Sequence, residues 1–537
     1  MAVAGNGRDL LARTALAHVP NLLTLLDRNR HSPTYGCFDR GFWHYRIVDF
    51  PSGMAQEFVF PLALAWDTNL EGNRWFRHPD LREWAGAGIR YAAASSHRDG
   101  AADDYYPFER AAGATAFSLL AGLETCRILD LRDDVVRNFF ARRADWLAAS
   151  REPGDIANHE ALIALCLLLA GALLKTGRWE AAAAKRLTHV LGLQDQEGWF
   201  REYGGCDPGY QTLTISALAW IGRLRPLPEL RSALVRGVDL AAHFMHPDGS
   251  YAGEYGSRST YNYFPHGFEL AGRDHPPALA LNDRFLAGLA AGRSAENADD
   301  HIVGHHAWNY LLAWRDYVGT RPAPAPPAPG RAWFPRAGLL VDRRNGWTLI
   351  VATNKGGVLK LFKDDRLVAS DTQFSVVQRH RRRLRNAVGH LVDRYETRVT
   401  ADTISVCGSL GWAKQRRMNT IEFLLLRLFM LTAGRFLAGT VRKVLQRLLI
   451  VGKREAPFRF EREICWRDDA WEIRDRLHAR SWRGVHAVML GCDQTSIYVA
   501  TSRTYQEGQL SGWVDLSDRV AALRAGEPLT LVRRPGG

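Results

Sequence analysis

The sequence changes character at Arg321 to Gly330, RPAPAPPAPG, which holds five prolines in ten residues. Proline fixes the backbone angle φ and donates no backbone hydrogen bond, so this stretch favours an extended spacer and excludes a helix. At 537 residues the chain is also too long for one compact core. We therefore predict two domains, residues 1–320 and 331–537, joined by a linker at 321–330.

Before the linker, apolar residues recur at intervals of three and four, which is typical of helices. Loops rich in glycine, aspartate, proline and aromatic residues separate the helical segments. Helical hairpins repeated over about 300 residues predict an α/α toroid, an incomplete barrel of hairpins, although a less regular helical array would give a similar pattern. The segments are Ala112–Leu129, Val135–Ala148, Ala161–Leu174, Ala181–Leu193, Leu213–Leu224, Leu230–Phe244, Ala278–Leu289 and His305–Tyr317.

After the linker, short runs rich in β-branched and aromatic residues alternate with turn residues, which is typical of strands. Their number and spacing predict an antiparallel β-sandwich. The runs are Ala337–Val341, Trp347–Ala352, Val358–Phe362, Thr397–Val406, Trp471–Leu477, His486–Gly491 and Ser496–Ala500.

One segment of this second half, residues 420–452, has a helical and strongly apolar pattern. Basic residues interrupt it too often for a membrane span. Two interpretations stay open: a helical hairpin packed on the sandwich, or a basic amphipathic surface that contacts anionic lipid or a membrane partner. The basic residues are Arg427, Arg435, Arg442, Lys443 and Arg447.

The formal net charge is +13, from 70 basic and 57 acidic residues. This excess is either a solvated basic surface or an attraction for a polyanion such as an acidic polysaccharide. The sequence contains no zinc-finger spacing, P-loop or other nucleic-acid motif, so we expect no nucleic-acid partner.

Seven scattered cysteines, an odd number with no C-x-x-C spacing, indicate reduced thiols instead of a disulfide framework. The first residues lack a sustained apolar stretch, so no signal peptide is evident. We expect a cytoplasmic location, peripheral to the inner membrane if residues 420–452 contact lipid.

The candidate site begins with Glu197 to Thr214, EGWFREYGGCDPGYQTLT, an aromatic-rich loop bounded by glycines. It presents Tyr210 at the start of a helix, while Asn158 and His159 begin an earlier one. An amide, an imidazole and a phenol suit removal of a proton next to a carboxylate, which indicates a lyase or epimerase acting on acidic sugars. Taken singly, Asn158 could instead be a helix N-cap and Tyr210 a turn aromatic.

These residues resemble the heparinase II/III-like family of polysaccharide lyases, in particular uncharacterised members associated with bacterial exopolysaccharide loci. In that family an α/α toroid precedes a β-sandwich, and an Asn-His pair begins one toroid helix. A later loop has the form D-G-x-x-x-E-x-S-x-x-Y-H, in which the tyrosine is the proton shuttle. Here Glu197-Gly198, Glu202 and Tyr210 match that loop. Gln211 replaces the histidine, and residues 204–209 replace the serine-containing stretch.

The resemblance implies β-elimination in a uronate-containing acidic polysaccharide. Asn158, helped by Gln211 or Arg258, would neutralise the carboxylate. Tyr210 would take the C5 proton and return one to the O4 oxygen. A neighbouring cation such as Arg258 would lower the pKa of the Tyr210 phenol. His159 would serve as base on the opposite face of the sugar. Two alternatives stay open: a uronate C5-epimerase, and a non-catalytic polysaccharide-binding component of a membrane-associated assembly complex.

A second loop, residues 248–266, repeats the pattern D-G-aromatic-x-x-E-Y-G with Ser250 inserted before the aromatic residue, and we expect both loops on one rim of the toroid. We predict no cofactor and find no metal-ligand set, although a structural divalent metal in the sandwich, as in some family members, stays open. The candidate substrate-binding residues are Glu202, Gln211, Arg258, Tyr255, Asn262, His266, Trp43 and His44.

Overall fold

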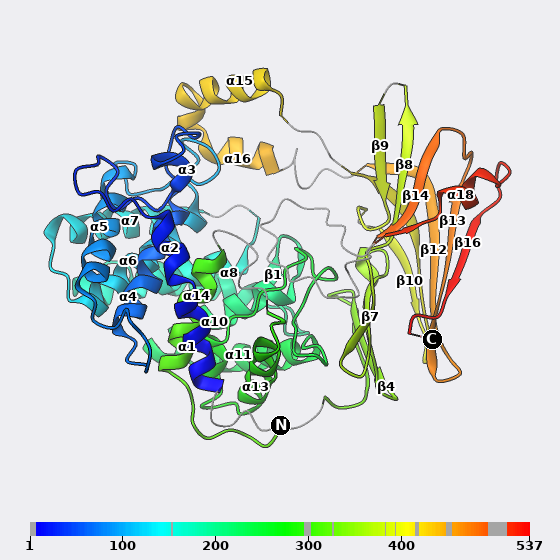
Figure 1. Cartoon of the computed structure of the whole chain (residues 1–537), viewed down its shortest axis with the longest axis horizontal. Coiled ribbons are helices and arrows are strands. Elements are labelled where there is room, and N and C mark those ends of the chain that lie inside the picture. The colour runs from blue at the N-terminus through cyan, green and yellow to red at the C-terminus, as the bar shows by residue number, and fades with distance from the viewer. Residues whose placement is uncertain are drawn as a thin grey trace.

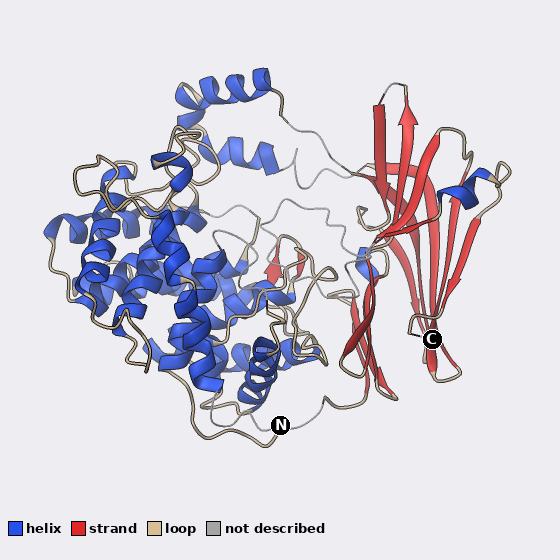
Figure 2. Ribbon diagram, in the orientation of Figure 1, coloured by secondary structure: helices blue, strands red, loops and turns tan. Residues whose placement is uncertain are grey.

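The structure is a computed structural model that describes residues 7–151, 154–294, 302–324, 327–381, 383–392, 394–413, 418–446, 454–491 and 513–536. Helices form one side of the molecule and strands the other (Figures 1 and 2). The long helices of the first half end with α14 at Arg315, and the first sandwich strand, β3, begins at Gly330. The change from helices to strands therefore falls on the proline-rich stretch.

An inner ring of helices forms the centre of the helical half. Each inner helix packs against the next, and the last packs back against the first, which closes the ring. Of the apolar inner helices, α6 is buried along almost its whole length and α8 is mostly buried as far as Ala170, as expected for helices surrounded by protein. The inner helices are α4 (Val59–Asp67), α6 (Ala112–Leu129), α8 (Ala157–Leu174), α10 (Pro208–Leu224), α12 (His266–Ala271) and α14 (Ile302–Arg315).

An outer layer of helices covers this ring, each packed on the inner helices beside it. These helices bury one face only, because their apolar residues lie along a single stripe. The two layers together make the α/α toroid that the sequence predicted. The outer helices are α1 (Gly7–Ala17), α5 (Pro79–Ser95), α7 (Asp134–Ala149), α9 (Glu180–Gly192), α11 (Pro228–His243) and α13 (Pro277–Ala290), with α2 (Val19–Leu25), α3 (Arg40–Trp43) and η1 (Met54–Phe58) near the N-terminus.

Two antiparallel sheets form the second half. In the five-stranded sheet β3 to β7, side chains alternate between faces: Leu339 and Val341 join the toroid core, whereas Leu340 joins the core between the sheets. This sheet is therefore covered on both sides, and the β-sandwich is confirmed. The strands are β3 (Gly330–Phe334), β4 (Leu339–Arg344), β5 (Trp347–Ala352), β6 (Val358–Lys363) and β7 (Arg366–Asp371), with η2 (Thr353–Lys355) between β5 and β6.

The second sheet has the order β15-β14-β8-β9-β11-β12-β13-β16, with β10 also paired to β11. Its strands are β8 (Phe374–His380), β9 (Arg383–Val388), β10 (Tyr395–Val399), β11 (Thr403–Trp412), β12 (Glu455–Arg467), β13 (Ala470–Ala479), β14 (Val485–Gly491), β15 (Trp513–Asp515) and β16 (Leu529–Arg533), and a short helix α18 (Ser517–Ala521) follows β15.

The segment between β11 and β12 is a helical hairpin made of α15 (Thr420–Leu431), η3 (Gly434–Phe436) and α16 (Ala438–Gln446). It leans on the toroid, since Arg427 forms an ion pair with Asp49 at 3.2 Å and lies 5.2 Å from the ring of Phe50. Figure 1 shows it beside the N-terminal helices. The interpretation that it packs on the sandwich was wrong.

Two further expectations about elements need correction or qualification. The run Thr397–Val406 is not one strand: β10 ends at Val399, and β11 begins at Thr403 after a turn closed by the Thr400 backbone and side chain. The run Ser496–Ala500 and Cys492 lie outside the described residues. The six cysteines inside them are free thiols.

Among the described residues, one helix, α8, is long and apolar enough to cross a membrane by length and composition alone. Its most apolar window is 67% buried inside the protein. Its place in the inner ring accounts for its composition.

Candidate active site

A tight hairpin places the loop that leads to Tyr210. Strand β1 (Arg201–Glu202) pairs with β2 (Gly205–Cys206) across a two-residue turn, Tyr203-Gly204. Both turn residues have positive φ, 52° and 87°, the backbone form that suits a two-residue hairpin. Helix α10 follows directly, with its N-cap at Asp207.

Asp207 joins the two candidate loops. One carboxylate oxygen accepts a hydrogen bond from the backbone N–H of Tyr210 at 3.0 Å, and the other accepts from the backbone N–H of Arg258 at 2.7 Å. The hydroxyl of Thr260 donates to the same carboxylate. Tyr210 and Arg258, 48 positions apart in the printed sequence, are therefore held by a single buried side chain.

Glu202 and Asn158 form a buried pair at the start of α8. The backbone N–H of Asn158 donates to one oxygen of Glu202 at 2.8 Å, and its side-chain amide donates to the other at 2.9 Å. Burial raises the pKa of Glu202 from near 4.5 to about 8, because loss of hydration outweighs these two bonds. Asn158 is not an N-cap, since that position of α8 is Ile156.

Arg258 brings a cation into this site. Its guanidinium lies 3.7 Å from the centre of the Tyr203 ring, and the residue is only 5% exposed. Within the part of the chain that the structure describes, its Nε and Nη1 have no hydrogen-bond partner. A buried guanidinium with unfilled donors carries a desolvation cost that an anionic ligand would relieve.

Tyr210 is half-buried in the first turn of α10. Burial raises the pKa of its phenol, and the charge of Arg258 opposes this shift without cancelling it. Arg258 thus lowers this pKa as expected, but burial outweighs its effect, and the pKa stays above its ordinary value. The phenol keeps its proton at neutral pH.

His159 follows Asn158 on α8 and is half-buried. Its ring packs against the N-terminal turn of α6, where a side chain on Gly113 would come within 2.8 Å of it. The ring of Phe117 lies 6.3 Å away, edge to face. Gly113 thus makes the space that His159 occupies.

Two predicted substrate contacts, Gln211 and Tyr255, have buried structural positions instead. Gln211 accepts from the Phe200 backbone and donates to the Gly237 carbonyl at 2.9 Å, so its amide is used inside the toroid. The hydroxyl of Tyr255 is 2.9 Å from a ring nitrogen of His246 in the core. These bonds give Gln211 and Tyr255 a role in loop packing.

His266 lies at the opposite end of α10. Its ring nitrogen is 3.0 Å from Asp316, and its ring packs edge to face on Trp220. Trp220 follows Tyr210 by ten positions, which corresponds to about 15 Å along a helix. The structure does not bring His266 to the site.

The remaining candidates are placed as follows. Trp43 donates its indole N–H to the Leu25 carbonyl at 2.7 Å, and His44 is exposed beside it. Asn262 is fully buried, and its side-chain amide has no partner within the described residues. No contact joins these three to Tyr210 or Arg258 in the described part of the chain, so their predicted role is untested.

The sandwich contributes residues that the sequence did not indicate. Lys355, in η2, donates to the carbonyls of Glu254 and Gly256 at 2.6 and 2.7 Å and to the hydroxyl of Ser259 at 2.9 Å. It thereby holds the loop that carries Arg258. Asp207 could have been found from its position before Pro208, an N-cap signal, whereas nothing near Lys355 in the sequence marks this contact.

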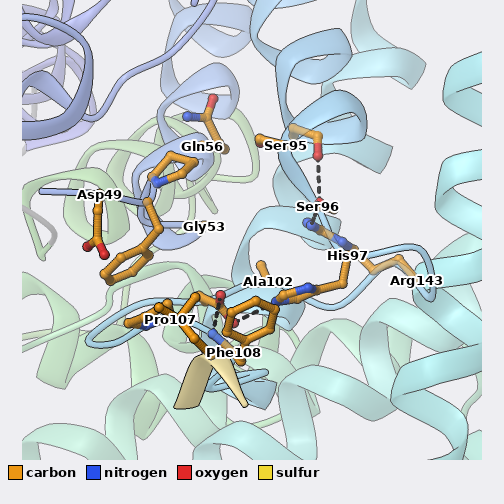
Figure 3. Close-up of a pocket in the computed structure, with 15 residues that line it drawn as sticks. Asp49, Gly53, Gln56, Ser95, Ser96, His97, Ala102, Pro107, Phe108 and Arg143 are labelled. Carbon is orange, nitrogen blue, oxygen red and sulfur yellow. Dashed lines mark hydrogen bonds and ion pairs between the residues drawn. The ribbon is translucent and has the colours of Figure 1, made fainter. Parts of the chain in front are cut away.

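A cavity of about 280 Å³ lies elsewhere, beside the N-terminal helices (Figure 3). In its lining, a ring nitrogen of His97 lies 2.9 Å from the Asp103 carboxylate, and Arg143 donates to Ser96. None of the residues that form the candidate site lines it. Among the described residues, no group of three or more His, Cys, Asp or Glu side chains could hold a metal ion.

No family model and no curated protein matches the sequence. Among solved structures, the chondroitin AC lyase of Streptomyces coelicolor A3 in complex with chondroitin sulphate matches with a TM-score of 0.51 and 13% identity, over 90% of this chain and 68% of that one. Heparinase III matches with a TM-score of 0.47 and 9% identity, over 92% of this chain and 80% of that one. A glycosidase in complex with glucose matches with a TM-score of 0.37 and 11% identity, over 58% of this chain and 98% of that one. The first of these shows that the chain shares the fold of a chondroitin AC lyase, an α/α toroid followed by a β-sandwich, as the sequence predicted.

Proposed function

We propose that this chain is a polysaccharide lyase that cleaves a uronate-containing acidic polysaccharide by β-elimination. The observation that carries the proposal is the buried guanidinium of Arg258, with two unfilled N–H donors beside Tyr210. A uronate carboxylate presents two coplanar oxygens that match such a fork. The net charge of +13 and the chondroitin sulphate bound by a structural neighbour support an acidic polymer.

The raised pKa of Glu202 suits an anionic substrate. With a pKa of about 8, Glu202 is mostly protonated at neutral pH, so Arg258 is not neutralised by it. Asn158 keeps one amide N–H beyond the one that Glu202 accepts. Arg258 and Asn158 together would withdraw charge from the substrate carboxylate and make the C5 proton more acidic.

Tyr210 would then act on the sugar. Because burial keeps its proton in place, it is ready to protonate the departing O4 oxygen. To remove the C5 proton itself it must first ionise, and the charge of Arg258 favours that step. His159 is the second candidate base. We retain from the sequence that the reaction needs no cofactor, takes place in the cytoplasm and serves bacterial exopolysaccharide metabolism.

The test follows the ultraviolet absorbance of unsaturated uronate with a panel of acidic polysaccharides. Tyr210→Phe should lower the rate at least about 100-fold, the usual contribution of a general acid or base. Tyr45→Phe, at an exposed tyrosine, should leave the rate unchanged. No absorbance change with any polymer would refute the lyase, and a Tyr210→Phe protein as fast as the wild type would refute the role of Tyr210.

A second candidate function is binding without cleavage, within a membrane-associated assembly complex. The raised pKa of Tyr210 and the buried amide of Gln211, at the position of the family's histidine, favour it. The third candidate function is a uronate C5-epimerase. Its sugar substrate would take up solvent deuterium at C5 without forming an unsaturated product. Measurable binding of a polymer with neither deuterium uptake nor unsaturation would support the binding protein.

A further inference from the structure

The hairpin of residues 418–446 presents a row of apolar side chains to solvent. Ile421, Leu424, Leu425 and Leu428 are 70%, 61%, 60% and 59% exposed. Their spacing of i, i+3, i+4 and i+7 places them on one face of α15. In the short helix η3 that follows, Phe436 is also 77% exposed. Contiguous apolar surface of this kind marks an interaction site.

The other side of the hairpin is fixed to the toroid, so the exposed row has a defined direction. Met430 is fully buried, and Arg427 pairs with Asp49. Leu431 helps to line the cavity of Figure 3 together with Phe50. In Figure 1, α15 lies at the edge of the molecule. The row is thus displayed by an anchored helix.

The charges around the row are mostly positive. Arg435 and Lys443 are exposed, whereas the one carboxylate of residues 418–446, Glu422, belongs to the capping box at the start of α15. The chain as a whole carries +13. Apolar side chains flanked by cations are the combination that binds an anionic lipid surface, where the apolar face enters the acyl boundary and the cations meet the headgroups.

A second copy of the chain is a poorer fit. In a twofold dimer the same patch meets itself, so the exposed cations of one hairpin would face those of the other. At +13 per chain, long-range repulsion would oppose the encounter as well. We propose that the α15–α16 hairpin docks the protein on the surface of an anionic lipid bilayer, lying in the interface without spanning it.

The test is flotation of the full chain with vesicles of phosphatidylcholine alone or containing one third phosphatidylglycerol. With about fivefold in affinity for each exposed cation, binding should be roughly 25-fold tighter on the anionic vesicles. A four-serine variant, Ile421→Ser, Leu424→Ser, Leu425→Ser and Leu428→Ser together, should abolish flotation. Because these side chains are exposed, the fold should persist, which the melting temperature verifies. Replacing the exposed Leu384 and Val532 of the sandwich by serine is the matched control.

Wild-type protein that does not float, or a four-serine variant that floats as well as the wild type, would overturn the proposal. Equal binding to both vesicle types would refute the claim that the hairpin prefers anionic lipid. Dimers that form in solution without lipid, and that the four serines dissolve, would assign the surface to a second copy instead. Flotation that the four serines abolish and the control variant retains supports the bilayer.

Discussion

Replacing the titrating carboxyl of Glu202 tests the raised pKa of this group independently of any substrate. The carboxyl has a folded pKa of about 8 against about 4.5 when unfolded, so between these values the folded protein binds more protons than the unfolded one. The stability that Glu202 contributes is then complete below pH 4.5 and is lost as pH rises through 8. Integrating the linkage gives a loss of roughly 3–4 kcal/mol between pH 5 and pH 8, out of a total of about 5 kcal/mol.

The substitution Glu202→Gln replaces the carboxyl by an amide that does not titrate. Asn158 can accommodate it by turning its own amide, since its Oδ1 has no partner within the described residues. We expect urea unfolding, followed by tryptophan fluorescence, to show the variant losing less stability than the wild type between pH 5 and pH 8. Subtracting the two curves removes the contribution of Glu109, whose pKa is also raised by burial, to about 7. A constant separation between the curves would refute the raised pKa of Glu202.

Two further substitutions test the packing that supports the site. Arg462→Met removes a fully buried cation that bonds Asp475 at 2.6 Å; urea unfolding should show a loss of about 3–5 kcal/mol, whereas the exposed Arg476→Met should change stability by less than about 0.5 kcal/mol. A small effect of Arg462→Met would show that the ion cluster relaxes. Gly113→Ala should cost about 1–3 kcal/mol, because its new methyl group meets the His159 ring. Gly192→Ala, with nothing within 4 Å, should leave the melting temperature unchanged or raise it, and equal effects of the two alanines would contradict the crowding at His159.

Local patterns in the sequence were sufficient for the elements whose surroundings follow from their own composition. The range predicted for Ala112–Leu129 coincides with α6, and that for Trp347–Ala352 with β5. An all-round apolar helix must be surrounded, and a short apolar run between turn residues is a buried strand. Closure of the ring, in contrast, depends on α4 meeting α14 across most of the helical half, and no local pattern carries that information.

The candidate site was predictable in its members more than in its chemistry. Asn158, Glu202, Tyr210 and Arg258 lie close together, as the family motif and the repeated loop pattern together predicted. Sequence spacing placed His266 with them as well, but that residue enters the structure at the far end of α10. The direction of the Tyr210 pKa shift was missed because it depends on burial, which the residue types alone do not give.

The sandwich does more than cover the toroid. Arg258 follows a loop whose carbonyls at Glu254 and Gly256 are bound by Lys355 of the sandwich. The next loop residues, Gly356 and Gly357, have positive φ, and the Gly357 carbonyl accepts a hydrogen bond from the buried Arg462 at 2.9 Å. The position of the unfilled guanidinium therefore depends on an ion cluster inside the second domain. This dependence gives a physical reason for the chain to keep both domains together: in the proposed lyase the toroid would supply the reacting groups, and the sandwich would fix the cation that binds the substrate.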